Sequence, residues 1–188
     1  MRKLSVVMMM VLASTGAFAQ KAADFIGVDD IFRIVTSRYI TMANEEADAE
    51  AVMDLYDEII TPYGYVHELP GDGYGGPCSI IDGYYKGGVN DVAQARFVPK
   101  DEMASVIFIS ACNMGDDSDY GYPEVTLTVY SERAVEAVFA QIVDAGFEQF
   151  QFDNPEEAGD AVLFYNGDRQ VVVTVDEWGY NFEFSIAE

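Results

Sequence analysis

The stretch Val125–Gly146, VTLTVYSERAVEAVFAQIVDAG, contains the two patterns on which the expected fold depends. Its first part alternates apolar residues with threonine, which is the period of a strand with one buried face. Its second part repeats apolar residues at intervals of three and four, which predicts a helix over 131–145. Ser131 is typical of an N-cap and Gly146 of the residue that ends a helix. The apolar stripe of this helix is Val135, Val138, Phe139, Ile142 and Val143.

Further strands are predicted on both sides of this stretch. Residues 105–111, SVIFISA, form a β-branched and aromatic run typical of a buried strand. Asn166-Gly167 is a hairpin signal, since both residues tolerate the positive φ that tight turns require. The other predicted strands after the helix are 147–152, 161–165, 171–176 and 180–186. The expected fold class is therefore α+β, with a mostly antiparallel sheet covered on one face by helix 131–145.

Two helices are predicted before the sheet. Apolar residues from Val28 to Tyr39, and again from Val52 to Ile60, recur at helical spacing. Asn44 is a plausible N-cap for the second helix, and Pro62 marks its end. Residues 20–62 thus read as a helical hairpin.

The segment 63–100 has a different composition. Half of the chain's sixteen glycines lie between residues 63 and 88, interleaved with tyrosines, which predicts turns and long loops. Short strands are expected near 78–85 and 93–98. The remainder, 104–188, holds the sheet and its helix, so residues 20–188 are predicted to form one α+β domain.

The first nineteen residues have the features of a cleavable export signal. Arg2 and Lys3 precede a nine-residue apolar run, and Ala17-Phe18-Ala19 is an A-x-A cleavage site. Nine helical residues rise about 14 Å, too little to cross a hydrocarbon core of about 30 Å. We therefore expect cleavage after Ala19, a periplasmic or extracellular location, and no stable membrane insertion afterwards.

The charge of the chain excludes whole classes of partner. Of its ten basic residues, two belong to the predicted signal, so 33 acidic residues face eight basic ones, a net charge of −25. Nucleic acids and anionic membrane surfaces select for lysine and arginine, so neither is an expected partner. Half of the residues are hydrophobic, which favours a folded domain over disorder.

Cys78 and Cys112 are the only cysteines. In an oxidising compartment, two cysteines suggest one disulfide, which would contribute about 3–4 kcal/mol on the chain-entropy estimate. Two separate buried thiols are the alternative. A zinc site is poorly supported, because His67 is the only histidine and no C-x-x-C motif is present.

No catalytic residue is predicted. His67 is the only candidate general base, and the chain has no G-x-S-x-G elbow, so this histidine is expected to be an ordinary surface or packing residue. Paired carboxylates of a hydrolase cannot be located among so many acids. The loop 113–119 is the best metal candidate, because Asp116, Asp117 and Asp119 place hard oxygen ligands of the kind Ca²⁺ needs close together. It matches no EF-hand, however, and a solvated connection is the simpler interpretation. No other cofactor is expected.

Tyrosines beside glycines are the remaining candidate binding residues. Tyrosine offers a large contact area with a polar tip, which suits recognition of a protein, peptide or glycan. Covering the ends of the sheet is their alternative role. The hypothesis is a non-enzymatic binding protein of the bacterial envelope, and the alternative is a small secreted hydrolase that uses acidic residues or a metal. The candidate residues are Tyr63, Tyr65, Tyr74, Tyr84, Tyr85, Tyr120 and Tyr122.

Overall fold

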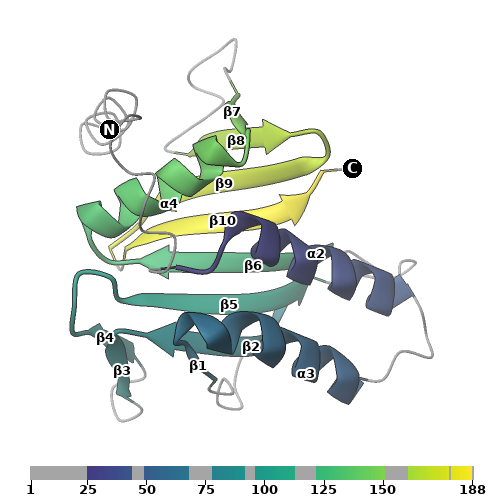
Figure 1. The fold of residues 1–188 in the computed structure, drawn as a ribbon, viewed down its shortest axis with the longest axis horizontal. Coiled ribbons are helices and arrows are strands. Elements are labelled where there is room, and N and C mark those ends of the chain that lie inside the picture. The colour runs from purple at the N-terminus through teal and green to yellow at the C-terminus, as the bar shows by residue number, and fades with distance from the viewer. Residues whose placement is uncertain are drawn as a thin grey trace.

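The protein is an α+β structure built on a mostly antiparallel sheet of eight strands (Figure 1). The computed structural model describes residues 25–43, 49–67, 78–91, 96–112, 122–150, 161–177 and 179–187. The predicted fold class and the antiparallel sheet are confirmed. The predicted signal, residues 1–19, and the acidic loop 113–119 lie outside the described residues.

The large sheet has the strand order β1-β2-β5-β6-β10-β9-β8-β7, and a separate two-stranded sheet pairs β3 with β4. All strand pairs among the described residues are antiparallel. The strands are β1 (Val66–His67), β2 (Cys78–Lys86), β3 (Gly88–Asp91), β4 (Arg96–Pro99), β5 (Ser105–Cys112), β6 (Tyr122–Val129), β7 (Glu148–Gln149), β8 (Val162–Asn166), β9 (Arg169–Val175) and β10 (Tyr180–Ile186).

The large sheet consists of two four-stranded halves that meet at β6 and β10. One half is β1-β2-β5-β6, with the β3–β4 hairpin inserted between β2 and β5, and the other is β7-β8-β9-β10. A helix precedes each half in the chain: α3 (Ala49–Ile60) before β1 and α4 (Glu132–Asp144) before β7. This similarity of the halves is not visible as an internal repeat in the sequence.

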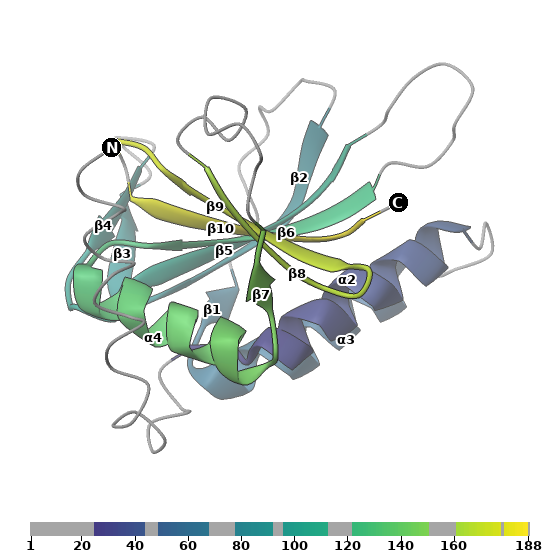
Figure 2. The same cartoon turned by 90° about the horizontal axis from the view of Figure 1, so that it is seen from above.

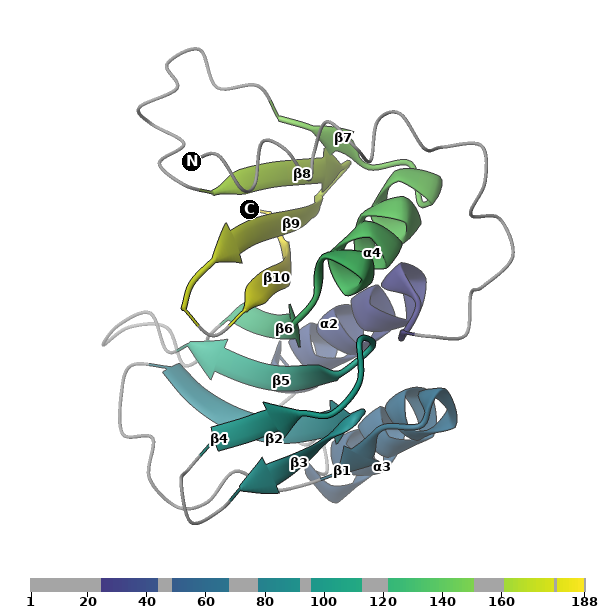
Figure 3. The same ribbon diagram turned by 90° about the vertical axis from the view of Figure 1, so that its left-hand side faces the viewer.

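Helix α2 (Val28–Ala43) contacts the sheet where the two halves join. Its neighbours are β6, β10 and helix α3. Figures 2 and 3 show α2, α3 and α4 on the same side of the twisted sheet. Residues 44–48, between α2 and α3, lie outside the described residues, so the predicted hairpin connection stays a prediction.

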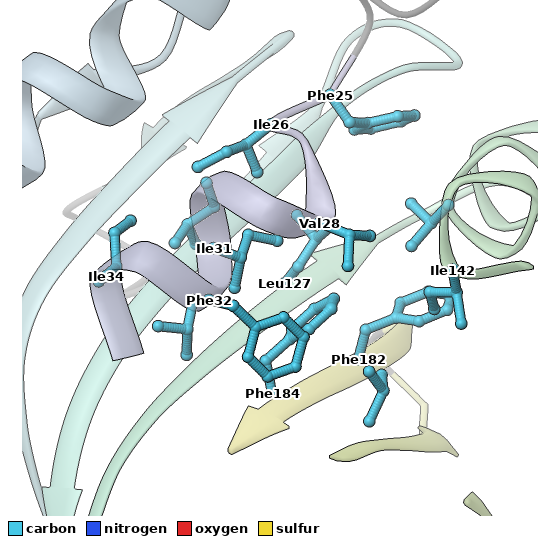
Figure 4. Packing of buried hydrophobic residues seen from close by; sticks show 14 of the residues in the cluster. Phe25, Ile26, Val28, Ile31, Phe32, Ile34, Leu127, Ile142, Phe182 and Phe184 are labelled. Carbon is cyan, nitrogen blue, oxygen red and sulfur yellow. The ribbon is translucent and has the colours of Figure 1, made fainter. Parts of the chain in front are cut away.

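The core lies between the helices and this side of the sheet (Figure 4). The Phe32 ring of α2 lies 5.5 Å from Phe147 and 5.7 Å from Phe184. Phe139 of α4 contacts Phe164 and Phe182 of the second half. The apolar positions of the alternating stretch in β6 are buried, as their period predicts: Val125, Leu127 and Val129.

The ends of α4 follow the sequence signals. The Ser131 side chain accepts a hydrogen bond of 3.1 Å from the Ala134 N–H, so it is the predicted N-cap. Gly146 follows the helix with φ of +80°, a conformation that favours glycine.

The predicted turn of the hairpin between β8 and β9 is wrong by one residue. Asn166 pairs with Arg169, so the turn is Gly167-Asp168 rather than Asn166-Gly167.

Several strands differ from their predicted bounds. Strands β1 and β3 were not predicted, because two or four residues among glycines give no usable period. The strand expected at 93–98 is β4, at Arg96–Pro99, and the one expected at 147–152 is described only as the two-residue β7. No described helix combines the length and apolar character needed to cross a membrane.

Candidate functional site

The single histidine lies between two carboxylates. His67 Nε2 is 2.5 Å from Asp82 Oδ1, and His67 Nδ1 is 3.2 Å from Asp57 Oδ1. The Tyr84 ring stacks on the imidazole at 4.8 Å between centroids. Its hydroxyl donates to Asp82 Oδ2 at 2.8 Å and lies 3.0 Å from Asp57 Oδ1. These four residues, the His67 cluster, connect α3, β1 and β2.

A β-bulge brings Asp82 into this cluster. Ile80 pairs with Ser110, but Asp82 pairs with Ile109, so the register shifts by one residue between them. Because side chains alternate across a strand, the extra residue turns Asp82 from the helix-free side to the side that faces the helices. Asp82 is consequently fully buried, although its sequence neighbours give no sign of this.

A tight turn brings His67 beside Asp57. Helix α3 ends at Ile60 and continues as a 3-10 turn over Thr61–Tyr63. Gly64 follows with φ of +83°, where its N–H bonds to the Thr61 carbonyl, and the chain then enters β1. The edge strand therefore runs back along the last turn of the helix.

Burial raises the pKa of two members of the cluster, Asp82 and Tyr84. Desolvation raises the pKa of Asp82, despite hydrogen bonds from Tyr84 and from the Gly83 N–H that favour its ionised form. Burial, and then the hydrogen bond to Asp82, raise the pKa of the Tyr84 hydroxyl, which therefore stays a protonated donor. The cluster thus combines one deeply buried acid with a tyrosine whose protonated hydroxyl donates to it.

This geometry does not suit general base catalysis by His67. A general base needs a ring nitrogen with a free lone pair directed at the proton it removes. Both ring nitrogens of His67 are directed at carboxylates, Nε2 at Asp82 and Nδ1 at Asp57. We therefore interpret the cluster as a structural tether between α3, β1 and β2.

Most of the described candidate tyrosines make contacts within the protein. Tyr65 and Tyr84 are buried in the core, where Tyr65 bonds to Ser105, so a partner cannot reach them as the binding hypothesis requires. Tyr63 is half-buried and donates to Asp30 at 2.6 Å. Tyr85 contacts Phe97 of the β3–β4 hairpin. Tyr74, Tyr120 and the side chain of Tyr122 lie outside the described residues.

The side of the sheet away from the three helices, here called the open face, carries apolar and acidic side chains among mainly polar ones. Direct partners in the antiparallel register share a face, and alternate residues along each strand belong to the same face. One row of partners runs across five strands on this face. It consists of Phe108 (β5), Thr126 (β6), Glu183 (β10), Val172 (β9) and Leu163 (β8).

Two exposed aromatic residues lie at one edge of the open face. Phe150 is 43% exposed and Tyr165 is 40% exposed, and their rings contact each other at 6.2 Å. The Phe150 N–H bonds to the Leu163 carbonyl, which places this residue beside β8. At the other end, Phe97 contacts Tyr85 and Tyr130, so the β3–β4 hairpin covers that end.

Two glutamates lie together near the middle of the open face. Glu124 of β6 lies on the same face as Glu183 of β10, two residues from its direct partner Thr126, and burial followed by the charge of Glu183 raises the pKa of Glu124. The five ion pairs among the described residues involve neither of these carboxylates. This acidic pair was not predicted, because its members are 59 residues apart and only strand pairing brings them together.

The predicted metal and disulfide residues remain untested. Asp116, Asp117 and Asp119 lie outside the described residues, and no cluster suited to a metal ion occurs within the described ones.

Cys78 and Cys112 are direct partners across β2 and β5. Such partners have Cα atoms about 4.5–5.5 Å apart, within the range of a disulfide. Their side chains are not described, so the bond stays a prediction.

Comparison of the chain with protein families, curated proteins and solved structures finds no match. Any functional conclusion therefore depends on the residues described above.

Proposed function

We propose that this chain is an exported, non-enzymatic protein of the bacterial envelope that binds a polypeptide partner on the open face of its sheet. In this proposal the predicted signal is removed after Ala19. Helices α2, α3 and α4 then cover one face of the sheet and form the core with it. The other face is left for recognition.

The observation that carries the proposal is a set of apolar side chains on the otherwise polar open face. A sheet face that serves only to meet water carries mainly polar residues. This face also has Phe108 at one side and Leu163 and Val172 at the other, next to the exposed Phe150 and Tyr165. Exposed aromatic residues grouped with aliphatic ones are typical of an interaction surface.

The geometry of the single histidine supports a binding role over catalysis. The one imidazole of the chain has both nitrogens engaged by Asp57 and Asp82, so the machinery for nucleophilic catalysis is not assembled around it. The net charge argues against nucleic acid and anionic membranes as partners. A polypeptide remains the class of partner that suits this surface.

Site-specific photo-crosslinking tests this proposal. A photoreactive phenylalanine analogue at Phe150 or Tyr165, in the full chain expressed in its own cells, is expected to give one defined crosslinked polypeptide. The same analogue at Val143 is the matched control, because this residue is 36% exposed but lies on α4. The identified partner should then bind the purified protein. Equal products at all three positions, or none at 150 and 165, would contradict the proposal.

A second candidate function rests on the acidic pair. Two carboxyl groups that share one proton are the arrangement of a proteolytic dyad, and burial, followed by the charge of Glu183, raises the pKa of Glu124 beside it. Peptide hydrolysis is therefore the reaction to test. Turnover of an unfolded protein at about pH 5 that is lost in Glu183→Gln would favour this function over binding.

A further inference from the structure

We propose that the open face recognises a cationic polypeptide segment, whose lysine or arginine side chains meet Glu124 and Glu183 while its apolar side chains pack beside them. This inference rests on the proposed function, and it names the chemistry of the partner. The occupant is a segment of a different protein rather than a second copy of this chain.

Charge complementarity identifies the occupant. Glu124 and Glu183 lie on the same face of neighbouring strands, are both partly buried, and form no ion pair with a described lysine or arginine. Two carboxylates this close repel each other when both are ionised, and burial adds to that cost. A lysine or arginine side chain placed between them would relieve both effects, and charge-assisted hydrogen bonds would hold it there.

The apolar residues on both sides of the acidic pair set the pattern of the segment. In the row across the sheet, Glu183 has Val172 and then Leu163 on one side. On the other side it has Thr126 and then Phe108. With strands about 4.8 Å apart, this row spans about 19 Å, the length of about six residues of extended chain. A segment with a basic residue near its centre and apolar residues toward both ends matches this order.

A second copy of the chain is a poor occupant. Two open faces packed against each other about a two-fold axis would bring the acidic pairs of both copies into one interface. With a net charge of −23 for the whole sequence, long-range repulsion opposes the same association. A partner of opposite charge has neither disadvantage.

Peptide binding to the purified protein tests the inference. The probe is a fluorescent peptide of alternating lysine and phenylalanine, about ten residues long. It is compared with peptides of the same length in which glutamate replaces lysine or serine replaces phenylalanine. We expect the lysine–phenylalanine peptide to bind most tightly, and Glu183→Gln to weaken it about tenfold. Asp144→Asn is the matched control, because it removes the same charge from the exposed surface of α4 and should change the affinity less than about twofold.

The outcomes separate this inference from the proposed function. Equal weakening by Glu183→Gln and Asp144→Asn would show attraction to net charge alone, and would overturn the inference. Equal binding of the lysine and glutamate peptides would overturn it as well. If crosslinking from residues 150 and 165 still captured a partner that Glu183→Gln does not release, the binding function would stand and the cationic partner would not. A complete absence of crosslinks would remove both.

Discussion

At the scale of single residues, the His67 cluster shows how hydrogen bonds accommodate a fully buried acid. Asp82 receives hydrogen bonds from the Gly83 N–H and from Tyr84, and its remaining contact is His67. Buried polar groups in proteins are stable when their hydrogen-bonding capacity is filled in this way. Desolvation nevertheless remains the larger effect and raises the pKa of Asp82. The balance between these effects can be measured.

Asp82→Asn should change how stability depends on pH. The folded pKa of Asp82 lies above its ordinary value of 3.8, so its ionisation opposes folding. The free energy of unfolding of the native protein should therefore fall, relative to the variant, as pH rises from 3.8 through the folded pKa. Urea unfolding across this pH range checks it, and parallel curves for the two proteins would contradict it.

At the scale of elements, strong local patterns predicted individual helices and strands well. The pairing of segments that are distant in the sequence could not be predicted. The helix at 131–145 was predictable because its cap, stripe and final glycine agree, and the alternating strands around it have a clear period. The bulge before Asp82 could not be predicted, since it exists only in the pairing of β2 with β5. The His67 cluster and the acidic pair were missed for the same reason, because their members are distant in sequence. The tyrosines were misleading, as composition does not distinguish the buried Tyr65 from an exposed ring.

The β3–β4 hairpin depends on a close approach at Gly88. A Cβ atom at this position would lie 2.1 Å from the Phe97 ring and 2.6 Å from the Val98 carbonyl oxygen. Gly88→Ala should therefore displace Phe97 from Tyr85 and Tyr130, and should lower the free energy of unfolding by about 1–3 kcal/mol. Denaturant unfolding, together with the ring chemical shifts of both tyrosines, checks this. Val89→Ile is the control, because it adds a carbon at an exposed position of the same strand, and equal stability of the two variants would contradict the account.

At the scale of the whole molecule, two similar halves form one continuous sheet with two unlike faces. Each half is a four-stranded antiparallel unit that follows a helix, and the halves join where β6 pairs with β10. The junction is also where α2 contacts the sheet on one side and where Glu124 meets Glu183 on the other. A partner centred on the acidic pair would therefore contact strands from both halves.

Relaxation of methyl signals by a soluble paramagnetic agent tests most directly whether the open face is the binding face. In the free protein, the agent should broaden the methyl signals of Leu163 and Val172 on the open face and of Val143 on α4. Saturation with the lysine–phenylalanine peptide should protect Leu163 and Val172 and leave Val143 broadened. Protection of Val143 with no change at Leu163 and Val172 would place the partner on the helical side and contradict the account.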